Sequence, residues 1–321
     1  MKKKSISTLS VVLLIALTLS ACSGQPSGTT TPAENTDALT IDNYGREIVI
    51  DSVPQQVLAL GPNCAELLVA LGLEEYIIGT SLRNHSRGPL PEYAAAIEAI
   101  PEINHAEATR EGAIASGADF IYGIDWEFGS ETLDVNELES YGMVTYINAA
   151  TTLEEQYQEI RDIGRIFGIE DVAELFVADQ QARIQAVQDA VSGQEPLKVL
   201  VYDSGSDGVF TASGINFESL LVSLAGGENI FGDLTDRAWV TVSYEEVLAR
   251  KPDIILIHDY DSPSMDAKIA EIKANDALSQ LDCVQNDRFA VISLESVLPG
   301  NRMAYTVEAL FAAFYPELTQ Q

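Results

Sequence analysis

The sequence predicts an α/β fold made of two Rossmann-like lobes with mostly parallel sheets, joined by a long backbone helix. The segments Glu111–Asp125 and Glu245–Asp259 share one pattern: each opens on Glu, has Asp at the ninth place and closes an apolar run on Asp. Between them lies a long helical segment that breaks at Gly168. A helix–turn–strand unit repeated on either side of a helical segment indicates two similar α/β modules.

The first module alternates apolar runs with helical segments. "QVLAL", "EYIIGTS", "FIYGI" and "MVTYI" predict strands, and the stretches near Ala65–Leu71 and Leu133–Ser140 predict helices. Thr109 stands two residues before Glu111, where it would cap the amino end of a helix. Continuous apolar strands are typical of parallel sheets that are covered on both faces.

The connecting segment predicts two helices. "TLEEQYQEIRDIGRIF" forms the first, and the second runs from about Asp171 to Val191. At about 1.5 Å per residue the second helix is about 30 Å long. A helix of that length can bridge two lobes.

The second module repeats the pattern of the first. "LKVLVYD", "IILI" and "RFAVIS" predict strands, whereas "INFESLLVSLAG" and a segment from about Met303 to Phe314 predict helices. Ser243 and Glu246 have the spacing of a capping box before the helix of the repeated segment.

The first residues predict export and a lipid anchor. Three lysines precede the apolar run Val11–Leu19 and the sequence "LSAC", which together read as a secretory signal. Cys22 follows as in the bacterial lipoprotein processing box, where the cysteine is acylated, and a polar stretch without aromatic residues predicts a linker. We therefore expect a location on the extracytoplasmic face of the cell membrane, lipid-anchored. The expected divisions are a signal peptide at 1–21, a linker at 22–38, an amino-terminal lobe at 39–150, connecting helices at 151–193 and a carboxy-terminal lobe at 194–321.

Composition excludes several classes of function. The formal net charge of -31 disfavours nucleic-acid binding, which needs clustered lysine and arginine. Cys64 and Cys283 lie in different halves of the chain, so we expect isolated buried thiols rather than a disulfide. No C-x-x-C pair suggests a cysteine metal centre. The sequence contains no G-x-S-x-G elbow, H-E-x-x-H motif or P-loop, so we expect neither enzymatic activity nor a resident cofactor.

Candidate binding residues stand where the predicted strands end, which is the working edge of a parallel sheet. The group comprises Arg83, His85, Trp126 and His258, and Asp203 also follows a predicted strand. His105 is added from the loop before the first repeated helix. His105 and His258 are also candidate ligands for the iron of a bound complex, although each is equally compatible with hydrogen bonding or a solvated loop position.

With these elements in place, the chain from about Tyr44 to Pro316 resembles the helical-backbone class of ABC-transporter substrate-binding proteins. That class serves importers of iron-siderophore complexes, heme and cobalamin. The resemblance lies in "VLALGPNCAELLVALGLEEYIIGTS", "SLLVSLAGGENIF", "AWVTVSYEEVLARKPDIILI" and "LPGNRMAYTVEAL", in that order.

The resemblance implies a receptor that captures a ferric siderophore or heme in the interlobe cleft and delivers it to an ABC permease dimer. Glu111 and Glu245, one in each repeated segment, would dock the permease. Trp239, Arg302 and Tyr305 would join the ligand-binding residues, with arginines suited to an anionic complex. A cobalamin receptor of the same class is the alternative.

A less favoured alternative lies outside the family. An extracellular metalloenzyme would use His105, His258 and Asp259 around an open coordination site.

Overall fold

The computed structural model describes residues 38–205 and 207–319. The predicted signal peptide at 1–21, Cys22 and all but the last residue of the predicted linker lie outside this range. Within it, no helix has the length and apolar character needed to cross a bilayer.

The amino-terminal lobe is built on a four-stranded parallel sheet in the order β4-β3-β5-β6. The strands are β3 (Val57–Leu60), β4 (Ile77–Thr80), β5 (Phe120–Ile124) and β6 (Val144–Asn148). The helices of this part are α1 (Pro62–Ala70), α2 (Ala94–Ala99), α3 (Arg110–Ala115) and α4 (Val135–Ser140). The residues of β3 and β5 are all buried, as continuous apolar strands require.

The carboxy-terminal lobe has its own four-stranded parallel sheet, in the order β12-β11-β7-β9. Its strands are β7 (Leu197–Tyr202), β9 (Gly227–Asn229), β11 (Ile254–Asp259) and β12 (Phe289–Ser293). Its helices are α7 (Phe217–Leu224), α8 (Tyr244–Arg250), α9 (Met265–Ala274), α10 (Asp282–Gln285) and α11 (Met303–Phe314).

The two sheets have matching strand orders. β3 and β7, the first strand of each sheet along the chain, both lie between the second and third strands. The predicted fold class, two parallel α/β lobes, is confirmed, and the sheets remain separate.

The repeated segment has the same structural role in both lobes. Thr109 Oγ1 accepts from the Gly112 amide to cap α3, and Ser243 with Glu246 forms the predicted capping box at α8. The ninth-place aspartates each hold the adjacent strand start: Asp119 accepts from the backbone of Gln55 and Gln56 ahead of β3, and Asp253 from the amide of Lys198 in β7. Much of the repeated pattern is therefore structural.

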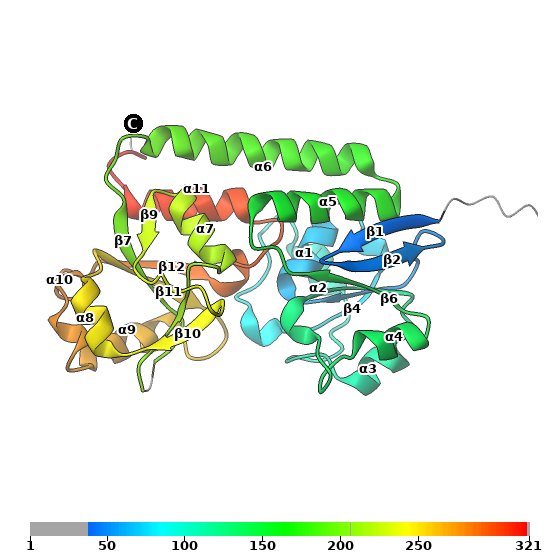
Figure 1. Cartoon of the computed structure of the whole chain (residues 1–321), viewed down its shortest axis with the longest axis horizontal. Coiled ribbons are helices and arrows are strands. Elements are labelled where there is room, and N and C mark those ends of the chain that lie inside the picture. The colour runs from blue at the N-terminus through cyan, green and yellow to red at the C-terminus, as the bar shows by residue number, and fades with distance from the viewer. Residues whose placement is uncertain (1–37, 206, 320–321) are drawn as a thin grey trace, which may run out of the picture. The chain divides into compact units, whose positions relative to one another are not determined.

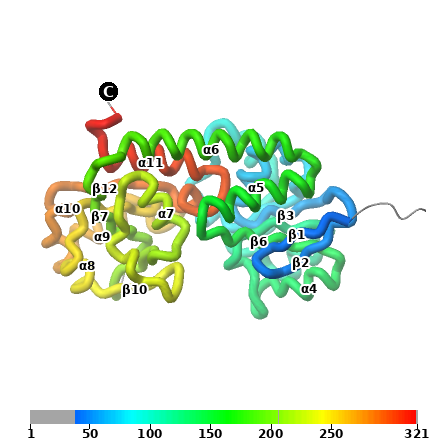
Figure 2. The backbone as a smooth tube through the Cα atoms, turned by 45° about the horizontal axis from the view of Figure 1, so that its top comes forward, coloured from blue at the N-terminus to red at the C-terminus, as the bar shows by residue number. Residues whose placement is uncertain are grey.

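Two consecutive helices form the predicted connection. α5 (Leu153–Phe167) ends at Gly168, whose φ of 66° is the left-handed conformation that glycine adopts readily, and α6 (Glu170–Val191) follows. Figures 1 and 2 both show α6 running along α5 and then along α11. On α6, Arg183 forms an ion pair with Glu308 of α11 at 2.6 Å. α6 therefore packs against a helix that precedes the second sheet in sequence and one that follows it.

Two antiparallel strand pairs were not predicted. One is a hairpin of β1 (Leu39–Asn43) and β2 (Arg46–Ile50). The other pairs β8 (Val209–Ala212) with β10 (Trp239–Val242), which lie on either side of α7 and β9 in the chain. The β8–β10 pair matters for function because it presents Trp239. As expected, Cys64 and Cys283 are buried and unpaired.

Candidate functional site

A cavity of about 350 Å³ is lined by residues of both lobes. His85, Glu107 and Trp126 come from the amino-terminal lobe. The other lining residues come from the second lobe: Asp203, Phe210, Trp239, Tyr260 and Leu294. We call this cavity the interlobe cleft.

The sheets place these side chains where parallel strands end. His85 lies in the 3-10 turn η2 (Arg83–His85) after β4, and Trp126 lies in η3 (Asp125–Glu127) after β5. Asp203 directly follows β7, and Tyr260 directly follows β11. The carboxyl edges of both sheets therefore contribute to one cavity, as expected for α/β proteins.

The cleft is predominantly aromatic. The indole of Trp239 stacks on Phe210 with ring centroids 5.4 Å apart and an interplanar angle of 22°. The imidazole of His85 lies 6.3 Å from the Trp126 ring and 6.1 Å from the Tyr260 ring, between centroids. Both tryptophans of the chain line this cavity. Such a lining offers broad apolar faces to a flat ligand.

His258 lies behind the aromatic wall and does not face the cavity. Its side chain is completely buried, with Nδ1 3.1 Å from Asp203 Oδ1 and Nε2 2.8 Å from Glu218 Oε1. Burial by itself lowers the pKa of His258, but the charge of Glu218 and the two hydrogen bonds outweigh burial and raise the pKa to about 9. The ring therefore donates through both nitrogens, and no lone pair remains for iron. This geometry corrects the expectation that His258 is an iron ligand.

Lys268 completes this buried cluster. Its Nζ donates to the backbone oxygen of His258 at 2.8 Å and lies 3.6 Å from the centroid of the Tyr260 ring. The Tyr260 hydroxyl in turn donates to Asp203 Oδ2 at 3.2 Å. Desolvation lowers the pKa of the Lys268 amine to about 8.

The predicted cleft arginines are committed elsewhere. Arg302 is 5% exposed and donates through Nε and Nη2 to both oxygens of Glu66, at 2.7 and 2.5 Å, in a pair that links the two lobes. Arg83 Nη2 donates to the backbone oxygens of Ile97 and Ile100 at 3.0 Å each. Because these groups hold the guanidinium side chains outside the interlobe cleft, the expectation that they bind an anionic ligand there is corrected.

Two further predicted ligand residues do not line the cleft. The His105 side chain is exposed, with Nδ1 3.1 Å from Glu102 and Nε2 3.8 Å from Asp261. Tyr305 is 41% exposed on α11. His85, Trp126 and Trp239 are thus the predicted residues that the structure brings together.

Four lining residues were not predicted: Glu107, Phe210, Tyr260 and Leu294. Asp203 was recognised at a strand end but not selected as a binding residue. Tyr260 also stands immediately after a strand, so the position of strand ends was sufficient to find it. Phe210 carries no such signal, because it enters the cleft from the unpredicted β8–β10 pair.

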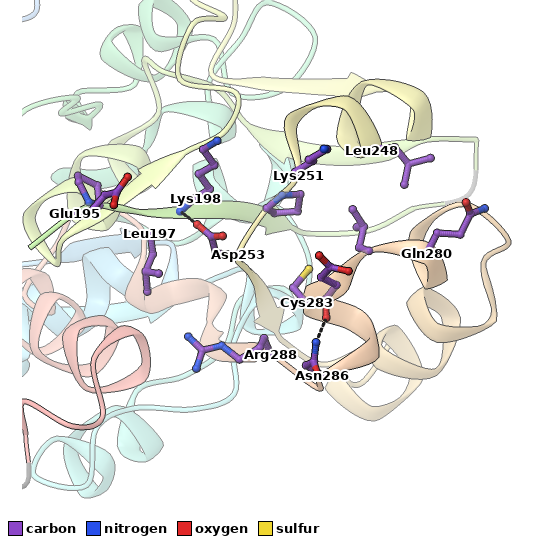
Figure 3. Close-up of a pocket in the computed structure, with 14 residues that line it drawn as sticks. Glu195, Leu197, Lys198, Leu248, Lys251, Asp253, Gln280, Cys283, Asn286 and Arg288 are labelled. Carbon is purple, nitrogen blue, oxygen red and sulfur yellow. Dashed lines mark hydrogen bonds between the residues drawn. The ribbon is translucent and has the colours of Figure 1, made fainter.

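A second hollow, of about 920 Å³, lies within the carboxy-terminal lobe (Figure 3). Lys198, Lys251 and Arg288 line it, but their side chains point in different directions in Figure 3. The acidic lining residues Glu195, Asp253 and Asp282 balance these charges, and no aromatic residue is among the described residues that line it. Although larger, this hollow lacks the convergent side chains of a binding site.

The docking candidates occupy equivalent, exposed positions. Glu111 is the second residue of α3 and its side chain is 83% exposed, and Glu245 is the exposed second residue of α8. Carboxylates at these positions also interact favourably with the helix dipole.

The chain matches a family model in a comparison with known proteins. The model described as periplasmic binding protein matches residues 127–294. The chain belongs to the periplasmic binding protein family. It is accordingly a substrate-binding protein of the ABC-transporter type that acts outside the cytoplasm, and it is not an enzyme.

Individual relatives are distant in sequence. The chain is 22% identical to the uncharacterized ABC transporter substrate-binding lipoprotein YvrC of Bacillus subtilis (strain 168), over 98% of both chains. It is 28% identical over 211 residues to the vitamin B12-binding protein of Pectobacterium atrosepticum, covering 64% of this chain and 72% of that relative. A periplasmic binding protein from Veillonella parvula has the same fold, with a TM-score of 0.77 and 24% identity over 87% of this chain and 98% of that one.

Proposed function

We propose that this periplasmic binding protein captures a metal complex in the interlobe cleft and delivers it to an ABC permease. The observation that carries the proposal is the convergence of aromatic side chains from both lobes on one cavity. Trp126 and Trp239 belong to different lobes, so a guest between them contacts both at once. Burying an aromatic contact of this kind contributes substantially to affinity.

A corrinoid is the first ligand to test. Its broad macrocycle suits the faces of Trp239 and Phe210, and the similarity to vitamin B12-binding proteins supports the same choice. A ferric hydroxamate complex without negative charge is the second, because a cavity of about 350 Å³ is small for complete burial of a corrinoid. Heme and polyanionic siderophores lose the support that cleft arginines would have provided.

Binding involves little closure of the lobes in this proposal. The buried Arg302–Glu66 pair and the packing of α6 along both α5 and α11 tie the lobes at the side where they join. Asn63 adds a hydrogen bond from its Nδ2 to the backbone oxygen of Pro299, at 2.7 Å. A preformed cleft reduces the conformational free energy lost on binding.

Glu111 and Glu245 are proposed to dock the permease dimer. Two equivalent helix starts that present carboxylates fit a partner with two equivalent basic sites. Complementary charge of this kind guides approach and sets register more than it adds affinity.

The lipid anchor is proposed at Cys22, on the sequence pattern that precedes it. Metabolic labelling with an alkyne-bearing palmitate tests it: the wild-type chain should carry the label and Cys22→Ala should not. Label retained on Cys22→Ala would refute the anchor.

Ligand binding is tested by thermal denaturation of the purified protein with cyanocobalamin, ferrioxamine B, ferric enterobactin and hemin. A ligand at one hundred times its dissociation constant stabilises the folded state by about 2.7 kcal/mol. We expect such stabilisation from cyanocobalamin or ferrioxamine B. Stabilisation by hemin or ferric enterobactin alone would overturn the proposed ligand class, and none from any of the four would overturn the proposal for this cleft.

A further inference from the structure

The charged side chains that line the interlobe cleft have one sign. Among the described lining residues, Glu107 and Asp203 are acidic, and none is lysine or arginine. Outside the lining, Arg87 pairs with Asp259 at 3.1 Å, and Arg302 pairs with Glu66. The cations His258 and Lys268 lie buried behind the lining, where His258 hydrogen-bonds to Asp203 and Lys268 contacts the Tyr260 ring. The described lining itself therefore presents carboxylates to a guest.

The carboxylate of Asp203 is largely buried and is held in place by hydrogen bonds. The side chain is 12% exposed, and its two oxygens accept from His258 Nδ1 at 3.1 Å and from the Tyr260 hydroxyl at 3.2 Å. Two such donors fix the orientation of the carboxylate, and an ionised carboxylate has acceptor capacity beyond them. The group that lines the cleft is thus oriented before any guest arrives.

The protonation state of Asp203 agrees with this geometry. Burial raises the pKa of the carboxyl, but the His258 hydrogen bond and the positive charges of His258 and Lys268 outweigh burial and hold the pKa below its usual range. Asp203 therefore remains ionised at neutral pH.

The aromatic walls act in the same direction as the carboxylates. The faces of Trp126, Trp239 and Phe210 carry the negative part of the ring quadrupole and attract cations, whereas the Tyr260 ring already holds the Lys268 ammonium. A negative group on a guest meets both these faces and the carboxylates unfavourably.

We infer that the interlobe cleft selects metal complexes that present a positive charge or hydrogen-bond donors, with Asp203 as the specificity-determining residue that accepts from the guest. This inference rests on the proposed receptor function and specifies its substrate class. Glu107, which is exposed at the same cavity, contributes at longer range.

The inference is tested with three ligands that share one ferric hydroxamate core and differ in net charge, a series that we call the charge ladder. Ferrioxamine B has a terminal ammonium, its N-acetyl derivative is neutral and its N-succinyl derivative is anionic. Dissociation constants are measured by calorimetry on the full, detergent-solubilised protein, with cyanocobalamin and the cationic aquocobalamin as a second matched pair. We expect affinity to fall about fivefold for each unit of positive charge removed, and the steps to shrink at high salt.

Substitutions at Asp203 and Glu107 test whether these residues cause the dependence of affinity on ligand charge. Asp203→Asn should reduce each step to less than twofold, while Asp282→Asn, an equivalent change in the second hollow, should leave the ladder unchanged. Glu107→Gln should reduce the affinity step for each unit of charge by a smaller factor. Because Glu107 is exposed, this variant should fold, and the test remains possible if Asp203→Asn does not fold.

The outcomes separate this inference from the proposed function. A flat or reversed ladder in the wild-type protein overturns the charge selection and leaves the receptor function standing. A ladder that persists unchanged in both Asp203→Asn and Glu107→Gln overturns the assignment to these residues. Failure of all five guests to bind overturns the inference and the proposed function together.

Discussion

A buried ion pair between Arg302 and Glu66 joins the two lobes. Arg302 forms two hydrogen bonds with Glu66, and its Nη1 also lies 3.4 Å from Glu295 Oε1. The side chains of Arg302, Glu66 and Glu295 are 6%, 2% and 1% exposed. Arg302→Met removes the cation and leaves two buried carboxylates without it.

Breaking a buried pair by removing one partner typically costs about 3–5 kcal/mol, because the remaining charge is not compensated. We therefore expect Arg302→Met to lower the free energy of unfolding by about 4 kcal/mol. For a urea dependence of about 3 kcal/mol per M, the midpoint should fall by more than about 1 M. The assay is equilibrium urea unfolding followed by circular dichroism and by tryptophan fluorescence.

Two controls sharpen this prediction. Glu66→Gln in the Arg302→Met background removes one of the two uncompensated charges and should restore about 2 kcal/mol. Arg46→Met breaks the partly exposed ion pair with Glu139 and should cost less than about 1 kcal/mol. If Arg302→Met costs no more than Arg46→Met, the lobes are not held by this pair and the reasoning is refuted.

Three further predictions follow. Trp239→Ala should raise the ligand dissociation constant, measured by calorimetry, at least tenfold, which is about 1.4 kcal/mol. An unchanged dissociation constant would show that the ligand does not bind in the interlobe cleft. Glu111→Arg with Glu245→Arg should abolish uptake in cells at unchanged ligand affinity, whereas normal uptake would remove the docking role. The free energy of unfolding should fall as the pH rises from about 4.5 to about 7. Burial raises the pKa of Glu159 to about 7, so in this range the folded state retains a proton that the unfolded chain has lost. Glu159→Gln should flatten this part of the profile, and profiles of equal slope would contradict the assignment.

The two lobes and the connecting helices α5 and α6 were predictable because their sequence signals are local, and those of the lobes are repeated. The spacing from Thr109 to Asp119 and from Ser243 to Asp253 encodes a cap, a helix and an anchor for the neighbouring strand. Such features depend on near neighbours in sequence and on apolar periodicity. The separate parallel sheets followed from them.

The site was only partly predictable because side-chain direction depends on the tertiary partner. Arg83 was selected at a strand end and Arg302 through the family resemblance, and neither signal reveals the partner. Glu66 lies 236 residues from Arg302 in sequence. The oxygens of Ile97 and Ile100, at the end of α2, lie 14 and 17 residues from Arg83. His258 stands on a strand end and yet turns into the protein, since Glu218 provides a buried carboxylate there. Hydrophobic periodicity carries no information about such pairings.

The central claim is that the guest lies between Trp126 and Trp239, and the chain offers a direct measurement because it has two tryptophans and both line the cleft. The protein labelled with 5-fluorotryptophan gives one ¹⁹F signal for each, assigned with Trp126→Phe and Trp239→Phe. On titration with diamagnetic cyanocobalamin, or with the gallium complex of desferrioxamine B, the account predicts that both signals shift in parallel with binding measured by calorimetry. Saturable binding that leaves both signals unmoved would contradict it.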